Sequence, residues 1–281
     1  MQASPLHLVA EPLLRADQLT IDYGSADAPV RAVHQVSFEV LRGERLVLLG
    51  PSGCGKSTLL KAVAGFVKPS AGSLHLAGRP ITGPGPDRIV VFQEFDQLPP
   101  WKTVKANIMF PLLATGVKRA EAAERALHWL ARVGLAGFAD AYPHTLSGGM
   151  KARVAIARAL AMQPAILLMD EPFASLDALT RRHMQEQLQS LWDEHHFTML
   201  FVTHSIEEAL VVGHRIVLLS PHPGRLRADI GSSEFTLTSS GSEAFQAASG
   251  RIHRLLFGAS AAAEAGPGSA RPGVGGREVH A

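Results

Sequence analysis

The stretch "ERLVLLGPSGCGKST", residues 44–58, decides the fold class. Its first half is an apolar run typical of a buried strand, and its second half is a glycine-rich loop that ends in a lysine and two hydroxyl residues. A helix is predicted from about Ser57 to Ala64, with Gly65 as its stop. A strand, a glycine loop and a helix in this order are typical of the phosphate loop of an α/β nucleotide-binding domain.

The loop supplies the groups that a triphosphate needs. Its glycines let the backbone wrap around an anion, and we expect Lys56 to neutralise the β- and γ-phosphates and the Ser57 hydroxyl to bind Mg²⁺. A thiol reagent on Cys54 should then block the nucleotide, unless this side chain only fills a small buried position. The predicted nucleotide-binding residues are Gly50, Pro51, Ser52, Gly53, Cys54, Gly55, Lys56, Ser57 and Thr58.

Two further motifs point to chemistry on phosphates. "AILLMDEP", residues 165–172, is an apolar strand that ends in Asp170, which suits the Mg²⁺ ion, and Glu171, which is placed to activate a water molecule. "LSGGMKAR", residues 146–153, offers bare backbone N–H groups at the start of a predicted helix, which is a second phosphate site. The chain therefore presents one phosphate site more than a single nucleotide requires.

The remaining pattern predicts an α/β core with a mainly parallel sheet, short strands before residue 49, and a helical subdomain inserted at residues 97–163. Within that subdomain, residues 118–135 place Ala123, Leu127, Leu130 and Val133 on one helix face, and Gly134 closes the helix. We expect a catalytic domain over residues 13–230, an extension with a helix over 231–258 and a disordered tail over 259–281.

Composition excludes several classes of protein. The 27 basic and 25 acidic residues nearly cancel, which argues against a nucleic-acid partner. Cys54 is the single cysteine, so no intramolecular disulfide forms. The N-terminus lacks the basic start of a signal peptide, and the apolar runs are far too short to span a bilayer. A membrane connection would therefore have to come through a partner.

Taken together, the motifs resemble those of the ATP-binding subunits of ATP-binding-cassette (ABC) transporters, over about residues 13–226. "LSGGM" is similar to the family's signature, "VFQ" to its Q-loop and "SLD" (175–177) to its D-loop. The resemblance implies ATP and Mg²⁺ as ligands, an N-terminal antiparallel β subdomain, and Glu171, His204, Gln93 and Lys56 as catalytic residues. It also implies that Gln93 senses metal and water, that His204 contacts the γ-phosphate, and that Tyr23 stacks on adenine.

Each of these residues also has a purely structural interpretation. His204 would be a core histidine, Tyr23 ordinary turn packing, Gln93 a polar strand end, and Asp170 and Glu171 a solvated acidic turn. The order of the motifs along the chain favours the functional interpretation of all of them.

The resemblance also explains the second phosphate site. It implies a head-to-tail homodimer in which Ser147, Gly148 and Gly149 contact the ATP held by the partner chain. It further implies attachment to two integral-membrane permease subunits at the cytoplasmic face of the inner membrane, with a substrate-binding protein acting indirectly. Met150, "ASLDALTR" (174–181) and "PHPGR" (221–225) resemble importers of the nitrate, sulfonate and taurine group.

Two departures from that group put the transported solute in doubt. Ala152 stands where the group usually has glutamine, and "QEFDQLPPWKTV" (93–104) has an extra proline. One alternative function is a soluble ABC-type ATPase of DNA repair, translation or cluster assembly. Another is an ATP-sensing docking protein with negligible turnover, against which the presence of Glu171, Gln93 and His204 argues.

Overall fold

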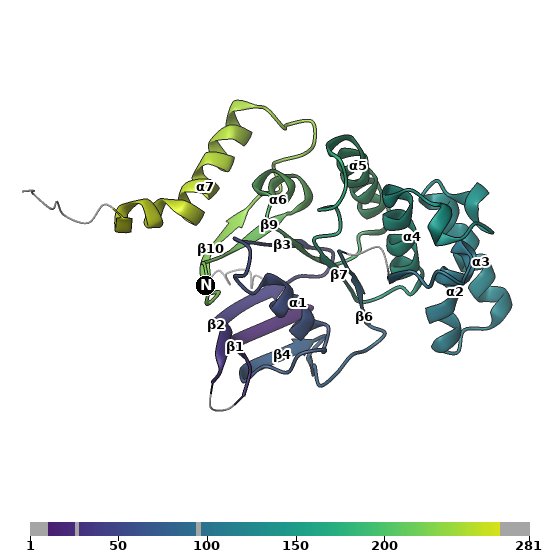
Figure 1. The fold of residues 1–281 in the computed structure, drawn as a ribbon, viewed down its shortest axis with the longest axis horizontal. Coiled ribbons are helices and arrows are strands. Elements are labelled where there is room, and N and C mark those ends of the chain that lie inside the picture. The colour runs from purple at the N-terminus through teal and green to yellow at the C-terminus, as the bar shows by residue number, and fades with distance from the viewer. Residues whose placement is uncertain (1–10, 26–27, 94–96, 265–281) are drawn as a thin grey trace, which may run out of the picture.

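Two β-sheets and a group of helices make up the part of the chain that the computed structural model describes, which is residues 11–25, 28–93 and 97–264 (Figure 1). The smaller sheet contains β1 (Leu14–Tyr23), β2 (Val30–Val40), β4 (Ala71–Leu76) and β5 (Arg79–Pro80), in the order β2-β1-β4-β5. All of its neighbouring strands are antiparallel. This sheet is the expected N-terminal antiparallel subdomain, which is thereby confirmed.

The larger sheet has six strands in the order β10-β9-β3-β8-β7-β6. Every neighbouring pair is parallel except β9 and β10. The central strands β7 and β8 are buried along their whole length, which explains why they appear in the sequence as continuous apolar runs. The predicted mainly parallel sheet is confirmed. Its strands are β3 (Arg45–Leu49), β6 (Arg88–Val91), β7 (Ile166–Asp170), β8 (Met199–Thr203), β9 (Arg215–Leu219) and β10 (Leu226–Gly231).

Some helices cover the parallel sheet, and others form a separate group at one side of it (Figure 1). Those close to the sheet are α1 (Lys56–Val63), α5 (Ala178–His195) and α6 (Ile206–Val212). The separate group contains α2 (Val104–Ala114), α3 (Arg119–Arg132) and α4 (Gly148–Ala161). The described residues between 97 and 163 contain no strand, as expected for an inserted helical subdomain.

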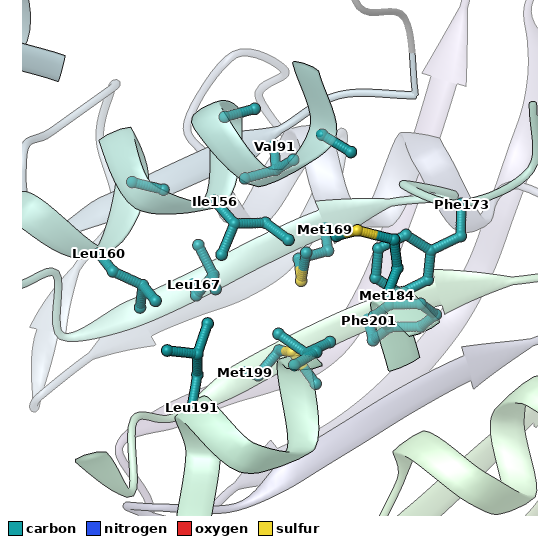
Figure 2. Packing of buried hydrophobic residues seen from close by; sticks show 14 of the residues in the cluster. Val91, Ile156, Leu160, Leu167, Met169, Phe173, Met184, Leu191, Met199 and Phe201 are labelled. Carbon is teal, nitrogen blue, oxygen red and sulfur yellow. The ribbon is translucent and has the colours of Figure 1, made fainter. Parts of the chain in front are cut away.

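Helix α4 joins this subdomain to the catalytic sheet. Ile156 and Leu160 on α4 face Leu167 and Met169 on β7, and all four side chains are buried (Figure 2). Burying such aliphatic side chains contributes about 1.5–3 kcal/mol each. A movement of α4 relative to the sheet must therefore preserve or replace these contacts.

The predicted buried face of α3 is wrong at one position. Leu127 is 46% exposed, whereas Ala122, Ala126 and Trp129 are buried together with the correctly predicted Leu130 and Val133. The real face is shifted around the helix by about one residue. It still has the spacing of an amphipathic helix, and it places the large indole of Trp129 in the interior.

The C-terminal extension forms a helix, α7 (Glu243–Glu264), whose Phe245 and Ile252 are buried in the same core as α6. The expected disordered tail began at residue 259, but the backbone is helical through Glu264. The segment "ASAAAE" (259–264) consists mainly of alanine, the best helix former, which accounts for the difference. The rest of the expected tail, residues 265–281, lies outside the described residues. Among the helices that are described, none combines the length and the apolar character needed to cross a bilayer.

Candidate ATP-binding and hydrolysis site

The carboxyl ends of four neighbouring strands meet along one edge of the large sheet, in the order β3, β8, β7 and β6. Crevices at this edge are the usual ligand sites of open α/β sheets. The segments that directly follow these strands are, in the same order, the loop 50–55, His204, Glu171 and the pair Phe92–Gln93. The sheet order therefore brings four separate sequence motifs to one edge.

The phosphate loop encloses its own lysine. Lys56 is 4% exposed, and its Nζ donates hydrogen bonds to the carbonyl oxygens of Gly50 at 2.8 Å and Pro51 at 3.0 Å. The ammonium group is thus held at the centre of the loop. Gly55, with φ of +94°, supplies the left-handed turn that leads directly into α1. A cavity of about 280 Å³ opens here, lined by Ala32, Ser52, Gly53, Gly55, Lys56, Ser57, Thr58, Glu171 and His222.

Ser57 and Asp170 bring two side-chain oxygens together at the start of α1. The Ser57 hydroxyl donates to Oδ1 of Asp170 at 2.7 Å, which ties α1 to the end of β7. Burial raises the pKa of the Asp170 carboxyl, and the hydrogen bond from Ser57 opposes this shift. Mg²⁺ usually takes one or two protein oxygens, and waters and substrate phosphates complete its shell. These two residues therefore fit a magnesium ion that binds together with a nucleotide.

The Glu171 carboxylate lies between two functional groups, the imidazole of His204 and the ammonium group of Lys56. Its Oε2 is 2.9 Å from Nδ1 of His204, and its Oε1 is 4.0 Å from Nζ of Lys56. Its backbone has φ of +46°, a left-handed conformation that costs about 1–3 kcal/mol for a residue with a side chain. Such strain is typical of functional sites, and here it turns the chain at the end of β7 so that the carboxylate reaches both neighbours.

Two predicted site residues lie at the margin of this group. The Tyr23 hydroxyl donates to Oγ1 of Thr58 at 3.3 Å, and the residue is 42% exposed, so its ring lies beside the phosphate-loop helix. Gln93 is exposed. Within the described residues, its side chain makes no hydrogen bond to Ser57 or Asp170.

Cys54 does not line the cavity at the phosphate loop. Its side chain is fully buried among core residues, and burial raises its pKa. The structural alternative, a small side chain filling a buried position, therefore describes Cys54 better than the expectation of an accessible thiol. The Cys54 side chain is therefore not exposed to a nucleotide in the cavity at the phosphate loop.

The loop 221–225 forms part of the nucleotide pocket, a role that the sequence analysis missed. His222 lines the cavity, and the Gly224 N–H donates to the carbonyl oxygen of Ala32 at 3.0 Å. A Cβ atom at residue 224 would overlap the carbonyl oxygen of Cys54. The motif "PHPGR" marks this loop in the sequence. The motif does not reveal that the loop lies against the phosphate loop, because that position depends on the pairing of β9 with β3.

The second phosphate motif begins α4. Ser147 is the N-cap residue, and its Oγ accepts a hydrogen bond from the N–H of Met150 at 3.3 Å. Ser147 and Gly149 line a cavity of about 640 Å³ together with residues of α5 such as Thr180 and His183. This cavity shares no lining residue with the cavity at the phosphate loop. The two phosphate motifs of one described chain therefore face different spaces.

Comparison with known proteins agrees with this geometry. Residues 33–174 match the ABC transporter family. The taurine import ATP-binding protein of Rhizobium johnstonii is 51% identical over 217 residues, which cover 77% of this chain and 82% of that protein. The chain belongs to the ABC transporter family. The bicarbonate transport ATP-binding protein of Synechocystis sp. is a further relative, 42% identical over 231 residues, which cover 82% of this chain and 80% of that protein.

Solved structures extend this ABC assignment to the fold and the reaction. A dimeric ATP-binding cassette bound to ADP and phosphate is 30% identical, has a TM-score of 0.67, and covers 78% of this chain and 98% of its own. A component of an ABC transporter complex from Clostridium perfringens is 27% identical, with a TM-score of 0.72 and coverage of 87% and 97%. The chain is an ATP-binding and ATP-hydrolysing subunit of an ABC transporter.

Proposed function

We propose that this ATPase powers an importer of a small anionic or zwitterionic solute, working as a head-to-tail homodimer on two permease subunits. The observation that carries the proposal is the separation of the phosphate loop and the signature into two cavities of one chain. Two head-to-tail copies would bring each signature against the partner's nucleotide, and twofold symmetry would produce two such composite sites.

The residues of the catalytic edge have distinct chemical tasks in this proposal. Glu171 accepts a proton from the attacking water, and Lys56 turns from the carbonyl oxygens of its own loop to the β- and γ-phosphates. Ser57 and Asp170 would hold Mg²⁺, which neutralises charge on the phosphates when it is bound. His204 orients the Glu171 carboxylate and contacts the γ-phosphate.

The signature is chemically ready to contact a second anion. Because the Ser147 oxygen accepts the N–H of Met150, the hydroxyl hydrogen remains available for donation to a phosphate oxygen. The N–H groups of Gly148 and Gly149 lie at the positive end of the 14-residue helix α4. ATP would then form part of the dimer interface, and hydrolysis would remove the contacts that keep the dimer closed.

A mixture of two differently tagged variants tests this arrangement. One chain carries Lys56→Ala, which disables its phosphate loop, and the other carries Ser147→Arg, which blocks its signature by bulk and charge. If the signature acts on the partner's ATP, both lesions fall in the same composite site and the other site stays intact. If it acts within its own chain, both sites are damaged. We therefore expect ATPase activity in the purified mixed dimer.

The control is a dimer of wild type with the Lys56→Ala/Ser147→Arg double variant. This combination damages both composite sites if the signature acts in trans and leaves one intact if it acts in cis. Comparing the two dimers corrects for cooperativity, which reduces the activity of a lone intact site equally in both. Higher activity in the wild-type/double-variant dimer would refute the trans arrangement.

Exposed aromatic residues support a docking surface for the permease near Gln93. Phe66 and Phe92 stack with ring centroids 6.4 Å apart and are 52% and 37% exposed, and Trp101 and Phe110 are 73% and 50% exposed. Large exposed aromatic side chains are typical of protein interfaces.

A photo-cross-linker at Trp101 should therefore capture a membrane protein in cells. Capture of ribosomal or DNA-repair proteins would instead favour a soluble ATPase. Asp96, an alternative attachment point, lies outside the described residues.

The relatives support the import direction and the solute class. Their names specify taurine import and bicarbonate transport, two small solutes that carry negative charge. The soluble-ATPase alternative is not favoured by these comparisons. On the importer proposal the chain lies at the cytoplasmic face of the inner membrane through its permease, and a substrate-binding protein delivers the solute. Solute uptake by cells that lack this chain, compared with complemented cells, tests the solute class.

A further inference from the structure

A hydrogen-bonded network connects the signature helix to the strand end that carries Gln93. The guanidinium of Arg158, on α4, donates to the carbonyl oxygen of Gln97 at 2.7 Å and to its side-chain Oε1 at 2.9 Å. The Gln97 Nε2 donates in turn to the carbonyl oxygen of Phe92 at 3.0 Å. Gln97 therefore touches α4 on one side and the residue directly before Gln93 on the other.

The Arg158 end of this network is firmly held. Arg158 is half-buried, and burial lowers the pKa of its guanidinium. In the part of the chain that the structure describes, both hydrogen-bond acceptors of the Arg158 guanidinium belong to Gln97. Hydrogen bonds from a charged donor are roughly twice as strong as neutral ones, and a buried charge without acceptors is costly. Arg158 and Gln97 therefore have to move together.

The segment that follows Gln97 is fixed to the helical subdomain as well. The amide of Asn107, on α2, is buried, and its Nδ2 donates to the carbonyl oxygens of Pro99, Lys102 and Thr103. Phe92, in contrast, directly follows β6, whose Val91 pairs with Met169 of β7. The bond between Gln97 and Phe92 thus crosses from the helical subdomain to the catalytic sheet.

We propose that Gln97 is a positioning residue that couples the Gln93 segment to the signature. Arg158 lies eleven residues after Ser147, which is about three turns of the same helix α4. A displacement at residues 92–93 would pass through Gln97 to Arg158, and along a rigid helix to Ser147 and Gly149. The inference rests on the proposed function, in which those two residues contact the partner's ATP.

Substitutions at residue 97 separate the two ends of the connection. Gln97→Glu keeps an oxygen for Arg158 and adds charge attraction, but it cannot donate to the carbonyl oxygen of Phe92. Gln97→Met removes both side-chain contacts and leaves the hydrogen bond from Arg158 to the backbone carbonyl oxygen of residue 97. The matched control is Gln189→Met, because the Gln189 side chain is also partly buried and donates to a backbone oxygen, that of Val211 at 2.7 Å, away from this network.

The readouts are kcat, the dissociation constant for ATP and the melting temperature of the full chain. Both substitutions at Gln97 should lower kcat by roughly tenfold, within the usual range of coupling between sites, and leave ATP affinity within about twofold of wild type. Gln189→Met should leave both kcat and ATP affinity unchanged. An additional Arg158→Met substitution should lower kcat little further in Gln97→Met, because the link from residue 97 to Phe92 is already lost in that variant.

Three results would contradict the inference. Wild-type kcat in Gln97→Glu would show that the Arg158 contact alone suffices. Parallel losses of kcat, ATP affinity and melting temperature would show that Gln97 has only a structural role. Wild-type kcat in Gln97→Met would show that the Gln97 side chain has no role in catalysis. Ser147→Arg is measured alongside: if that variant keeps wild-type kcat, the proposed function fails, whereas if it is inactive and the Gln97 variants are active, only this inference fails.

Discussion

Nδ1 of His204 lies 2.9 Å from Oε2 of Glu171, so the expected general base is held by a side chain from the neighbouring strand. The contact exists because β7 and β8 are parallel neighbours and both end at the catalytic edge. Glu171 is the less exposed partner, with 18% of its side chain accessible against 54% for His204. The more exposed histidine thus contacts a carboxylate that is mostly shielded from solvent.

Glu171→Gln should bind ATP but hydrolyse it at less than about a tenth of the wild-type rate, because an amide cannot accept a proton from water. The side chain keeps its size and still reaches His204. ATP affinity and steady-state turnover are measured together, and size-exclusion chromatography should show an ATP-stabilised dimer of the variant. A variant that retains more than about a tenth of the activity would exclude Glu171 as the base.

Cys54 should react slowly with thiol reagents in the folded protein. The side chain is fully buried and its pKa is raised by burial, so modification has to wait for local opening of the phosphate loop. Mg-ATP should slow the reaction further, because a bound nucleotide stabilises the closed loop. The control is the denatured chain, which should be labelled at one site. Rapid stoichiometric labelling of the native chain would contradict the buried position.

Gly224→Ala should weaken ATP binding, whereas Gly231→Ala should not. A Cβ at residue 224 would overlap the carbonyl oxygen of Cys54, a backbone atom of the phosphate loop, so the loop has to shift. Gly231 has open space around its Cβ position and makes the matched control. Equilibrium binding of a fluorescent ATP analogue and thermal unfolding separate a local from a global effect. Equal ATP affinity in the two variants would show that the loop 221–225 does not shape the site.

The protein should lose stability in mild acid through His214. Partial burial and the neighbouring Arg45 lower the pKa of His214 to about 4, from the 6.5 of an unperturbed histidine, and Asp193 opposes the shift. The unfolded chain therefore binds more protons between these values, and the free energy of unfolding falls as the pH drops from about 6.5 to about 4. His214→Gln should show a smaller loss over this range in urea titrations at several pH values. An unchanged loss would assign the acid sensitivity to other groups.

Patterns over short stretches of the sequence were sufficient to predict the catalytic core. The strand, loop and helix of residues 44–64 and the acidic strand end at Asp170 follow from short-range patterns, because apolar periodicity and glycine placement act over a few residues. The inserted helical subdomain was predictable for the same reason. The roles of Gln93 and Tyr23 stay predictions, since the contacts of their side chains do not establish them.

Only the tertiary structure decided which side chains meet. Arg158 and Gln97 are 61 residues apart in the chain, and Gly224 lies against Cys54 only because β9 pairs with β3. The orientation of Cys54 and the buried face of α3 depend in the same way on the surfaces packed against them. Sequence patterns specify which face of a strand or helix is apolar, whereas the partner of that face is selected by the shape and volume of the whole core.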